Sequence, residues 1–184
     1  MRVHELVTKL TSGIGSDDPM ARTRGLLEDL RSNLDAVGDA LAFVSGTGGN
    51  AGQIFYRSPD LSLLKVRFPS GRRTPPHDHG TWAMILLLSG AEKNTLYRVG
   101  DEGSLRRTSE VVLERGSLLP MRANAVHVAE CMGENPAIGL HVYGGDILGL
   151  ERRMWDPETL TEYPLDWDHY EELARKASRA DGAP

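Results

Sequence analysis

The sequence predicts a mostly β fold, a small barrel of antiparallel strands that follows an N-terminal helical segment. From about Gln53 to Leu150, short β-type runs alternate with turn residues at close spacing, with no helical pattern between them. Many short strands without intervening helices are typical of a sandwich or a barrel. Glycine contributes 20 of 184 residues, about 11% against a usual ~7%, which favours a turn-rich β architecture over a helical bundle.

Residues 1–46 are predicted to be helical. Val3, Leu6, Val7 and Leu10 fall at helical spacing, and Thr11-Ser12-Gly13 ends this first helix. A second helix should begin at Asp17 or Asp18, either of which can cap it, with Pro19 in its first turn. It should continue to about Ser45, with an apolar face made of Leu26, Leu27, Leu30, Leu34, Val37 and Leu41. Such a stripe indicates packing against the next layer of the fold.

The barrel is expected over residues 53–155. Its predicted strands are Leu61–Phe68, Trp82–Leu88, Asn94–Val99, Glu110–Leu113, Val126–Met132 and Ala137–Tyr143. Gly46–Asn50 is glycine-rich, but it lacks the preceding strand and the Lys-Ser/Thr pair of a phosphate-binding loop, so it is predicted to be a linker. A solvent-facing helix is expected from about Asp166 to Ala180. We therefore predict one domain over residues 1–184, with a C-terminal extension at 156–184.

Charge and composition exclude several classes of function. The net charge of −5 argues against binding to nucleic acid or to anionic lipid. No apolar run approaches the roughly 20 residues of a membrane span, and Met1–Glu5 do not resemble the start of a signal peptide. Cys131 is the single cysteine, so no internal disulfide can form. The expected compartment is the cytoplasm.

A histidine pair is the most informative feature of the sequence. In Pro75-Pro76-His77-Asp78-His79, the two prolines favour an extended approach. Residues i and i+2 of a strand share a face, so His77 and His79 can present two imidazoles to one point. A third ligand must come from another strand, and His127 lies within a later β run. Nitrogen donors of this kind suit a borderline divalent metal.

The spacing around these histidines resembles the motifs of the cupin family. His77 follows Gly71 in the pattern G-x5-H-x-H, Gly90 follows the next strand, and Gly116–His127 resembles the second cupin motif. This resemblance implies a jelly-roll β-barrel with one metal. Many cupins add a glutamate ligand four or five residues after the second histidine, but Ala83 and Met84 stand there. A site of three neutral histidines keeps the full metal charge and suits an anionic substrate together with O₂.

From Gln53 to Trp155 the chain is more specifically similar to the thiol dioxygenases, the cysteine dioxygenase family of cupins, and above all to the bacterial branch that oxidises 3-mercaptopropionate. The segments that carry this resemblance are His77-Asp78-His79-Gly80-Thr81-Trp82, Ser89-Gly90-Ala91-Glu92 and His141-Val142-Tyr143-Gly144-Gly145. The resemblance implies Fe(II) held by His77, His79 and His127. It also implies an active-site tyrosine at Tyr143, supported by His141.

The same resemblance implies an arginine that binds the substrate carboxylate. In the mercaptopropionate branch this arginine lies nine residues after the tyrosine, which is Arg152 here, and Gln53 aligns with a glutamine of that branch. Arg57 could instead play the equivalent role known from the cysteine-specific branch. The animal enzymes have a cysteine near Met84 that cross-links to the tyrosine, and no thiol stands here. The branch also has a serine where this chain has Gly139.

The implied reaction adds both atoms of O₂ to a small thiol that carries a carboxylate, 3-mercaptopropionate or cysteine, and gives its sulfinate. Two alternatives stay open. Gly139 leaves room for an iron oxygenase with a non-thiol substrate, and many cupins are non-catalytic metal or ligand binders. Nucleic-acid and membrane partners are not expected, and the sequence leaves a monomer and a homo-oligomer equally open.

Overall fold

The computed structural model describes residues 1–44 and 52–180, so the predicted linker at Gly46–Asn50 lies outside them. The helices are α1 (Val3–Thr11), α2 (Pro19–Leu30), α3 (Leu34–Ala42) and α4 (Trp167–Ala180), with one-turn 3₁₀ helices η1 (Arg31–Asn33) and η2 (Asp101–Gly103). Of the two candidate caps, Asp18 is the one used: its carboxylate accepts a hydrogen bond of 2.9 Å from the Ala21 amide. In this part of the chain, no helix is both long and apolar enough to cross a membrane.

The prediction of one continuous second helix is wrong. Between α2 and α3 the chain tightens into η1, and the backbone of Asn33 leaves the helical region with φ −144° and ψ 54°. The Ser32 hydroxyl bonds the Asp29 carbonyl at 2.7 Å. Serine and asparagine side chains compete with the helical hydrogen bonds of the backbone, which explains the break between α2 and α3. The apolar stripe continues on both sides of this break.

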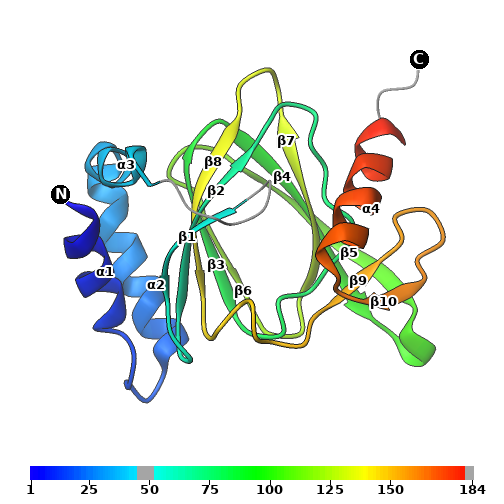
Figure 1. Cartoon of the computed structure of the whole chain (residues 1–184), viewed down its shortest axis with the longest axis horizontal. Coiled ribbons are helices and arrows are strands. Elements are labelled where there is room, and N and C mark those ends of the chain that lie inside the picture. The colour runs from blue at the N-terminus through cyan, green and yellow to red at the C-terminus, as the bar shows by residue number, and fades with distance from the viewer. Residues whose placement is uncertain (45–51, 181–184) are drawn as a thin grey trace.

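The strands form antiparallel sheets that face one another around the barrel interior (Figure 1). One sheet has the order β1-β2-β8-β3-β6, a second has β5-β4-β7, and β10 pairs with β9. Their bounds are β1 Gly52–Arg57, β2 Ser62–Phe68, β3 Ala83–Ser89, β4 Ala91–Val99, β5 Leu105–Leu113, β6 Leu118–Met121, β7 Val126–Met132, β8 Ala137–Tyr143, β9 Arg153–Trp155 and β10 Glu162–Pro164. Every predicted strand is present, whereas β1, β6, β9 and β10 had not been predicted.

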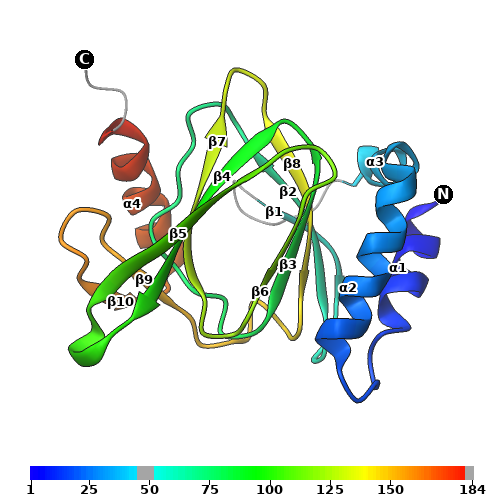
Figure 2. The ribbon, with the colours of Figure 1, turned by 180° about the vertical axis from the view of Figure 1, so that it is seen from behind.

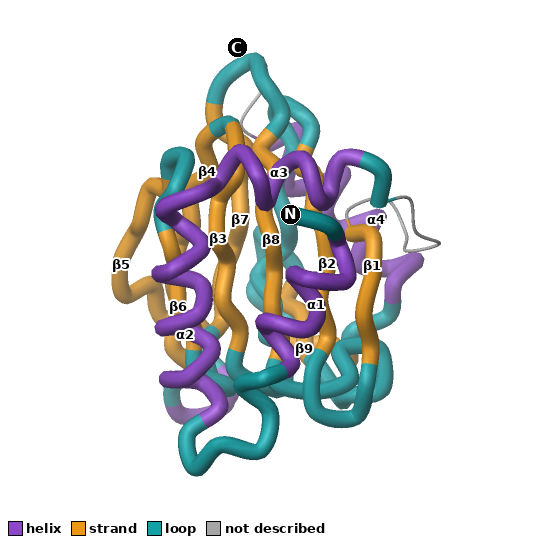
Figure 3. The backbone as a smooth tube through the Cα atoms, turned by 90° about the vertical axis from the view of Figure 1, so that its left-hand side faces the viewer, coloured by secondary structure: helices purple, strands orange, loops and turns teal. Residues whose placement is uncertain are grey.

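Helices α1 to α3 lie across the outer face of the five-stranded sheet (Figure 3). Strand β8 shows how the two layers are built, because its alternate residues face opposite sides. Leu140 and Val142 pack in the core shared with the helices, while Ala137 and Tyr143 belong to the core inside the barrel. The apolar stripe of the N-terminal segment therefore packs on the sheet, as predicted.

The C-terminal helix is not the solvent-facing helix that we expected. Tyr170, Leu173, Ala174 and Ala177 of α4 are buried at helical spacing, and Tyr170 and Leu173 form a small core with Met154 of β9. Helix α4 stands on the opposite side of the barrel from α1 to α3 (Figures 1 and 2). Helix α4 thus covers one side of the barrel.

Gly90 joins β3 directly to β4 and has a left-handed backbone, with φ of 75°. A Cβ at this position would lie 2.5 Å from the Pro136 carbonyl oxygen. Glycine is therefore required here on two grounds, the positive φ and the close approach of another segment. This is the glycine that the motif spacing had singled out.

Candidate metal centre

The segment from Thr74 to His79 lies extended between β7 and β9. The amides and carbonyls of His77 and His127 bond each other in both directions at 3.0 Å, and the Asp78 amide donates to the Arg153 carbonyl at 3.0 Å. This pairing on both sides holds the segment as a strand, as its two prolines predicted. His77 and His79, at i and i+2, then point into the barrel together with His127.

The three histidines form one cluster of potential metal ligands. One nitrogen of each ring lies within 4.8 Å of the others. The residues His77, His79 and His127 are only 5%, 3% and 2% exposed. The Nδ1 of His77 lies 3.0 Å from the Pro75 carbonyl, and the Nδ1 of His127 lies 2.7 Å from the Asn94 side-chain oxygen. Nδ1–H donors of this kind leave Nε2 as the free lone pair of each ring.

The Nε2 atom of His127 gives a direct test of whether a metal fits. This atom is buried and has no hydrogen-bond partner among the described residues. A buried unsatisfied nitrogen is costly unless a ligand occupies it. Imidazole nitrogens suit Zn, Cu, Fe and Ni ions, so the three residues fit a divalent transition metal.

Burial also keeps the cluster neutral. Desolvation lowers the pKa of His77 and of His79 well below the ordinary value, and the neighbouring His127 lowers each further. Desolvation, followed by the charge of Arg152, lowers the pKa of His127 to about 3. Neutral imidazole is the form that binds metal, so the rings are ready for an ion near neutral pH.

Ala83 and Met84 occupy the two positions at which many cupins have a glutamate ligand. Ala83 is paired across the sheet with Tyr143 and belongs to the barrel core, whereas Met84 points to the helical layer. Neither side chain offers an oxygen to a metal or a thiol for a cross-link to the tyrosine ring. Tyr143 itself packs beside the cluster, with its ring centroid 5.0 Å from that of His79.

Tyr143 and His141 form the predicted hydrogen-bonded pair. The Tyr143 hydroxyl lies 3.0 Å from Nδ1 of His141. Burial raises the pKa of Tyr143 above its ordinary value and lowers that of His141 to about 3. A Cβ added at Gly139 would lie 3.0 Å from Nε2 of His141, and this nitrogen is buried without a described partner. The pair therefore ends at Gly139, where the branch that the sequence resembles has a serine.

Arg152 lies at the same site. The positive charge of its guanidinium acts on His77, His79 and His127, lowering the pKa of each. Its Nε donates to the Asp78 carbonyl at 3.2 Å, and its guanidinium carbon lies 5.5 Å from the centre of the Trp167 ring. Burial lowers the pKa of Arg152. Among the described residues, no carboxylate pairs with this cation.

The other two candidate substrate residues, Arg57 and Gln53, lie on strand β1. Arg57 is bound to Asp146 by two hydrogen bonds of 2.5 and 2.7 Å, and its side chain is 46% exposed. Gln53 is paired across β1 and β2 with Lys65, whose ammonium bonds the Leu41 carbonyl at the end of α3. Directly opposed residues share a face of a sheet, so Gln53 faces the helices and not the barrel interior. Arg57 opposes Ser62, which in turn opposes Tyr143, so Arg57 lies on the barrel face, where Asp146 holds its guanidinium. Among the described residues, neither Arg57 nor Gln53 contacts the histidines.

Several residues around the site had not been predicted. Asp78, between two of the candidate ligands, accepts hydrogen bonds from the Arg153 amide at 2.9 Å and from its Nε at 2.8 Å. Tyr170 of α4 packs edge-on against His77, with ring centroids 5.4 Å apart. Tyr170 and Leu173 are apolar residues at i and i+3 of a helix, and that spacing was the signal of a buried face.

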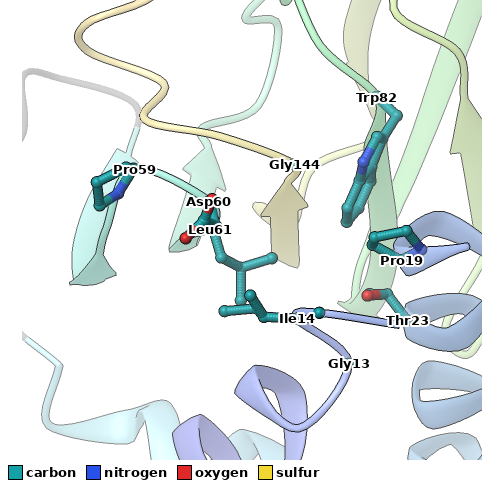
Figure 4. Close-up of a pocket in the computed structure, with 10 residues that line it drawn as sticks. Gly13, Ile14, Pro19, Thr23, Pro59, Asp60, Leu61, Trp82 and Gly144 are labelled. Atoms are coloured by element: carbon teal, nitrogen blue, oxygen red, sulfur yellow. The ribbon is translucent and has the colours of Figure 1, made fainter. Parts of the chain in front are cut away.

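A separate cavity of 210 Å³ lies outside the barrel, between the α1–α2 loop and the rim of the large sheet (Figure 4). Its lining residues are Gly13, Ile14, Gly15, Pro19, Thr23, Pro59, Asp60, Leu61, Trp82 and Gly144. The Trp82 indole lies against the Gly144 backbone, where an added Cβ would collide with the ring nitrogen. This cavity contains none of the three histidines, so it is distinct from the metal centre.

No protein-family model matches the chain. Its structure is similar to that of the DMSP lyase DddQ from Ruegeria pomeroyi DSS-3, with a TM-score of 0.50 and 17% identity over 72% of this chain and 77% of that chain. It is also similar to an RmlC-like cupin with a double-stranded β-helix fold from Methanocaldococcus jannaschii, with a TM-score of 0.43 and 10% identity over 56% and 89% of the two chains. A third similar structure is the hydroquinone 1,2-dioxygenase PnpCD, with a TM-score of 0.42 and 12% identity over 49% of this chain and 61% of that chain. The match therefore spans less than two thirds of the dioxygenase chain. The fold is that of a cupin.

Removal of any one ligand should abolish tight metal binding, since two imidazoles cannot surround an ion. We expect His77→Ala, His79→Ala and His127→Ala each to lose stoichiometric Fe(II) after anaerobic loading and desalting, as measured by metal analysis. The control is His141→Gln, which alters a buried histidine outside the cluster and should keep its iron. Full occupancy in one of the alanine variants would remove that residue from the ligand set.

Acid should destabilise the metal-free protein steeply. His77, His79, His127 and His141 stay neutral in the fold because burial lowers their pKa values, whereas in the unfolded chain each binds a proton below about pH 6.5. Glu92 opposes this effect with one proton, because burial raises its pKa from 4.5 to about 7. The unfolded state therefore binds about three more protons near pH 5.5, and the free energy of unfolding should fall by about 4 kcal/mol per pH unit on acidification.

Urea unfolding in EDTA between pH 7.5 and 5.5 measures this slope. His141→Gln should reduce it by about 1.4 kcal/mol per pH unit, the contribution of one proton. His4→Gln changes an exposed histidine and should leave it unchanged. A flat profile would mean that the four rings are protonated in the fold.

Proposed function

We propose that the protein is an iron-dependent thiol dioxygenase that converts a small carboxylate-bearing thiol, 3-mercaptopropionate or cysteine, to its sulfinate with O₂. The observation that carries this proposal is Arg152, a partly buried guanidinium that lies beside a cluster of three neutral histidines and has no carboxylate partner among the described residues. The resemblance in the histidine and tyrosine motifs supports the same assignment.

The charges of the site favour a dianionic substrate. Three neutral histidines leave the charge of a divalent ion uncompensated, and Ala83 supplies no carboxylate. Arg152 adds a further positive charge in a poorly solvated position. A molecule that carries a thiolate and a carboxylate would neutralise both centres at once.

Fe(II) held by the three histidines would supply the binding and activation of both the thiol sulfur and O₂. Arg152 would orient the substrate: its Nε is occupied by the Asp78 carbonyl, so its terminal nitrogens remain for a bidentate contact with a carboxylate. Trp167 packs on the guanidinium and restricts its position. The substrate carboxylate would thereby be fixed relative to the histidines.

Tyr143 would donate a hydrogen bond to oxygen charge that develops in the reaction. Its raised pKa keeps the phenol protonated. When His141 Nδ1–H donates to the Tyr143 oxygen, the phenol proton is free to point into the site, and His141 Nε2 is left as an acceptor. A water beside Gly139 would satisfy that acceptor in place of the serine of the related branch.

Gly139 is also the observation that favours a second candidate, an iron oxygenase acting on a non-thiol substrate. The experiment that tests the proposal is O₂ consumption by iron-loaded protein with 3-mercaptopropionate, cysteine and cysteamine, with the sulfinate identified by mass spectrometry. We expect turnover with an acid thiol. If none of these thiols supports O₂ consumption, the proposal is contradicted, and a non-thiol oxygenase or a non-catalytic cupin remains.

Alanine substitution of Arg152 and of Arg57 should show which of the two arginines binds the substrate carboxylate. A bidentate arginine–carboxylate contact in a partly desolvated pocket contributes on the order of 2–5 kcal/mol. Arg152→Ala should therefore lower kcat/KM for the acid thiol by roughly 30-fold to several thousand-fold. Arg57→Ala is the control, because Arg57 is already paired with Asp146, and should lose much less.

Cysteamine lacks a carboxylate, so it should be a poor substrate and nearly indifferent to Arg152→Ala. If Arg57→Ala has the larger effect, the cysteine-type arrangement applies. If the unmodified protein oxidises cysteamine as well as the acid, no arginine selects the substrate.

A further inference from the structure

A chain of buried polar side chains leads away from the metal centre into the barrel. Asn94 of β4 places its side-chain oxygen 2.7 Å from Nδ1 of His127, and its amide nitrogen donates to the Glu92 carboxylate at 2.8 Å. Glu92, Asn94 and His127 are 1%, 0% and 2% exposed. The order of the chain is therefore carboxylate, amide, imidazole, with the free Nε2 of His127 at its end.

Glu92 has no role as a direct metal ligand. Its carboxylate is not part of the cluster of nitrogens that could hold an ion. In the described part of the chain, no lysine or arginine forms a salt bridge with Glu92. The adjacent Lys93 is paired instead with Glu130, 2.8 Å away. A buried carboxylate without a cation is costly, and a glutamate at this position therefore needs an explanation beyond packing.

The explanation lies in the direction of the hydrogen bonds. An ionised carboxylate only accepts, so Asn94 must turn its NH₂ group toward Glu92 and its oxygen toward His127. The Asn94 oxygen also only accepts, so His127 must carry its proton on Nδ1. Nε2 is then unprotonated, which is the state that binds a metal. Glu92 thus dictates the tautomer of a ring that it does not touch.

We propose that Glu92 is a positioning residue that, through Asn94, fixes the metal-binding tautomer and the orientation of His127. This inference rests on the metal centre and not on the substrate of the proposed reaction. An outer hydrogen-bond partner of this kind also makes the ligand more basic, and its loss typically weakens metal binding by 10- to 100-fold.

The first test variant is Glu92→Gln, which keeps size and removes the directional constraint. A glutamine amide can accept from Asn94 or donate to it. In the second arrangement Asn94 flips, its NH₂ group faces His127, and the imidazole proton moves to Nε2. We expect metal-free E92Q to contain both tautomers and to bind Fe(II) 10- to 100-fold more weakly.

The second variant is the double substitution Glu92→Gln with Asn94→Asp, which restores the direction with different groups. The amide introduced at position 92 would donate to the carboxylate introduced at position 94, and that carboxylate would accept from Nδ1–H of His127. Fe(II) affinity and the Nδ1–H tautomer should return to near the original values. A merely structural role for Glu92 would not be rescued in this way. Glu130→Gln is the matched control, a glutamate on the adjacent strand that is paired with Lys93.

Two measurements decide the proposal, both at pH 8, above the pKa of about 7 of Glu92. Long-range ¹H–¹⁵N NMR of the metal-free protein reports the His127 tautomer, and anaerobic titration with Fe(II) alone reports affinity. Nδ1–H in the original protein, mixed tautomers with weaker binding in E92Q and recovery in the double variant support the proposal. Nε2–H in the original protein overturns it without any variant.

Unchanged tautomer and affinity in a folded E92Q also overturn the proposal, as does a folded double variant that does not recover. If E92Q does not fold, the double variant against the original protein carries the comparison. Because no thiol or O₂ enters either measurement, absence of thiol oxidation would refute the proposed function while leaving this inference intact.

Discussion

The two main-chain hydrogen bonds between His77 and His127 are the constraint on which the site depends. They tie the segment from Thr74 to His79, which precedes β3, to strand β7, which lies far along the chain. The candidate ligands are therefore brought together before any metal is present. Asp78 secures the other edge of the same segment by binding Arg153. Because the backbone is held on both sides, the imidazoles converge in fixed positions and little conformational entropy is left for an ion to remove.

The electrostatic character of the centre follows from burial more than from charge pairing. Desolvation keeps four histidines neutral, and the same desolvation acts on Arg152, which must remain charged because guanidinium does not lose its proton in proteins. An enclosed cation beside neutral ligands produces a site that favours anions. Of the buried carboxylates near the centre, Asp78 is paired with Arg153 and Glu92 accepts a hydrogen bond from Asn94. Negative charge is thus left for the substrate to supply.

Sequence patterns predicted the barrel and the histidine cluster because both depend on the spacing of nearby residues. Runs with a period of two predicted the strands, and the H-x-H pair with its motif glycines predicted the histidine cluster. They failed where tertiary contacts decide. Short strands such as β6, which contains Pro120 and lies at the edge of its sheet, carry too few residues for a periodic signal, and proline is tolerated at an edge. The spacing from Tyr143 favoured Arg152 but left Arg57 as a competitor. Only the partner Asp146, 89 residues from Arg57, distinguishes a paired arginine from an unpaired one.

The helices at the two ends of the chain serve different purposes. Helices α1 to α3 cover the outer face of the five-stranded sheet, and their contacts with residues such as Leu140 and Val142 stabilise the barrel without reaching its interior. Helix α4 instead places Tyr170 against His77 and Trp167 against Arg152. A shift of α4 would therefore displace the ring that packs on His77 and the ring that lies over Arg152 together. The helix that we expected to face solvent therefore contributes two aromatic side chains that lie beside His77 and Arg152.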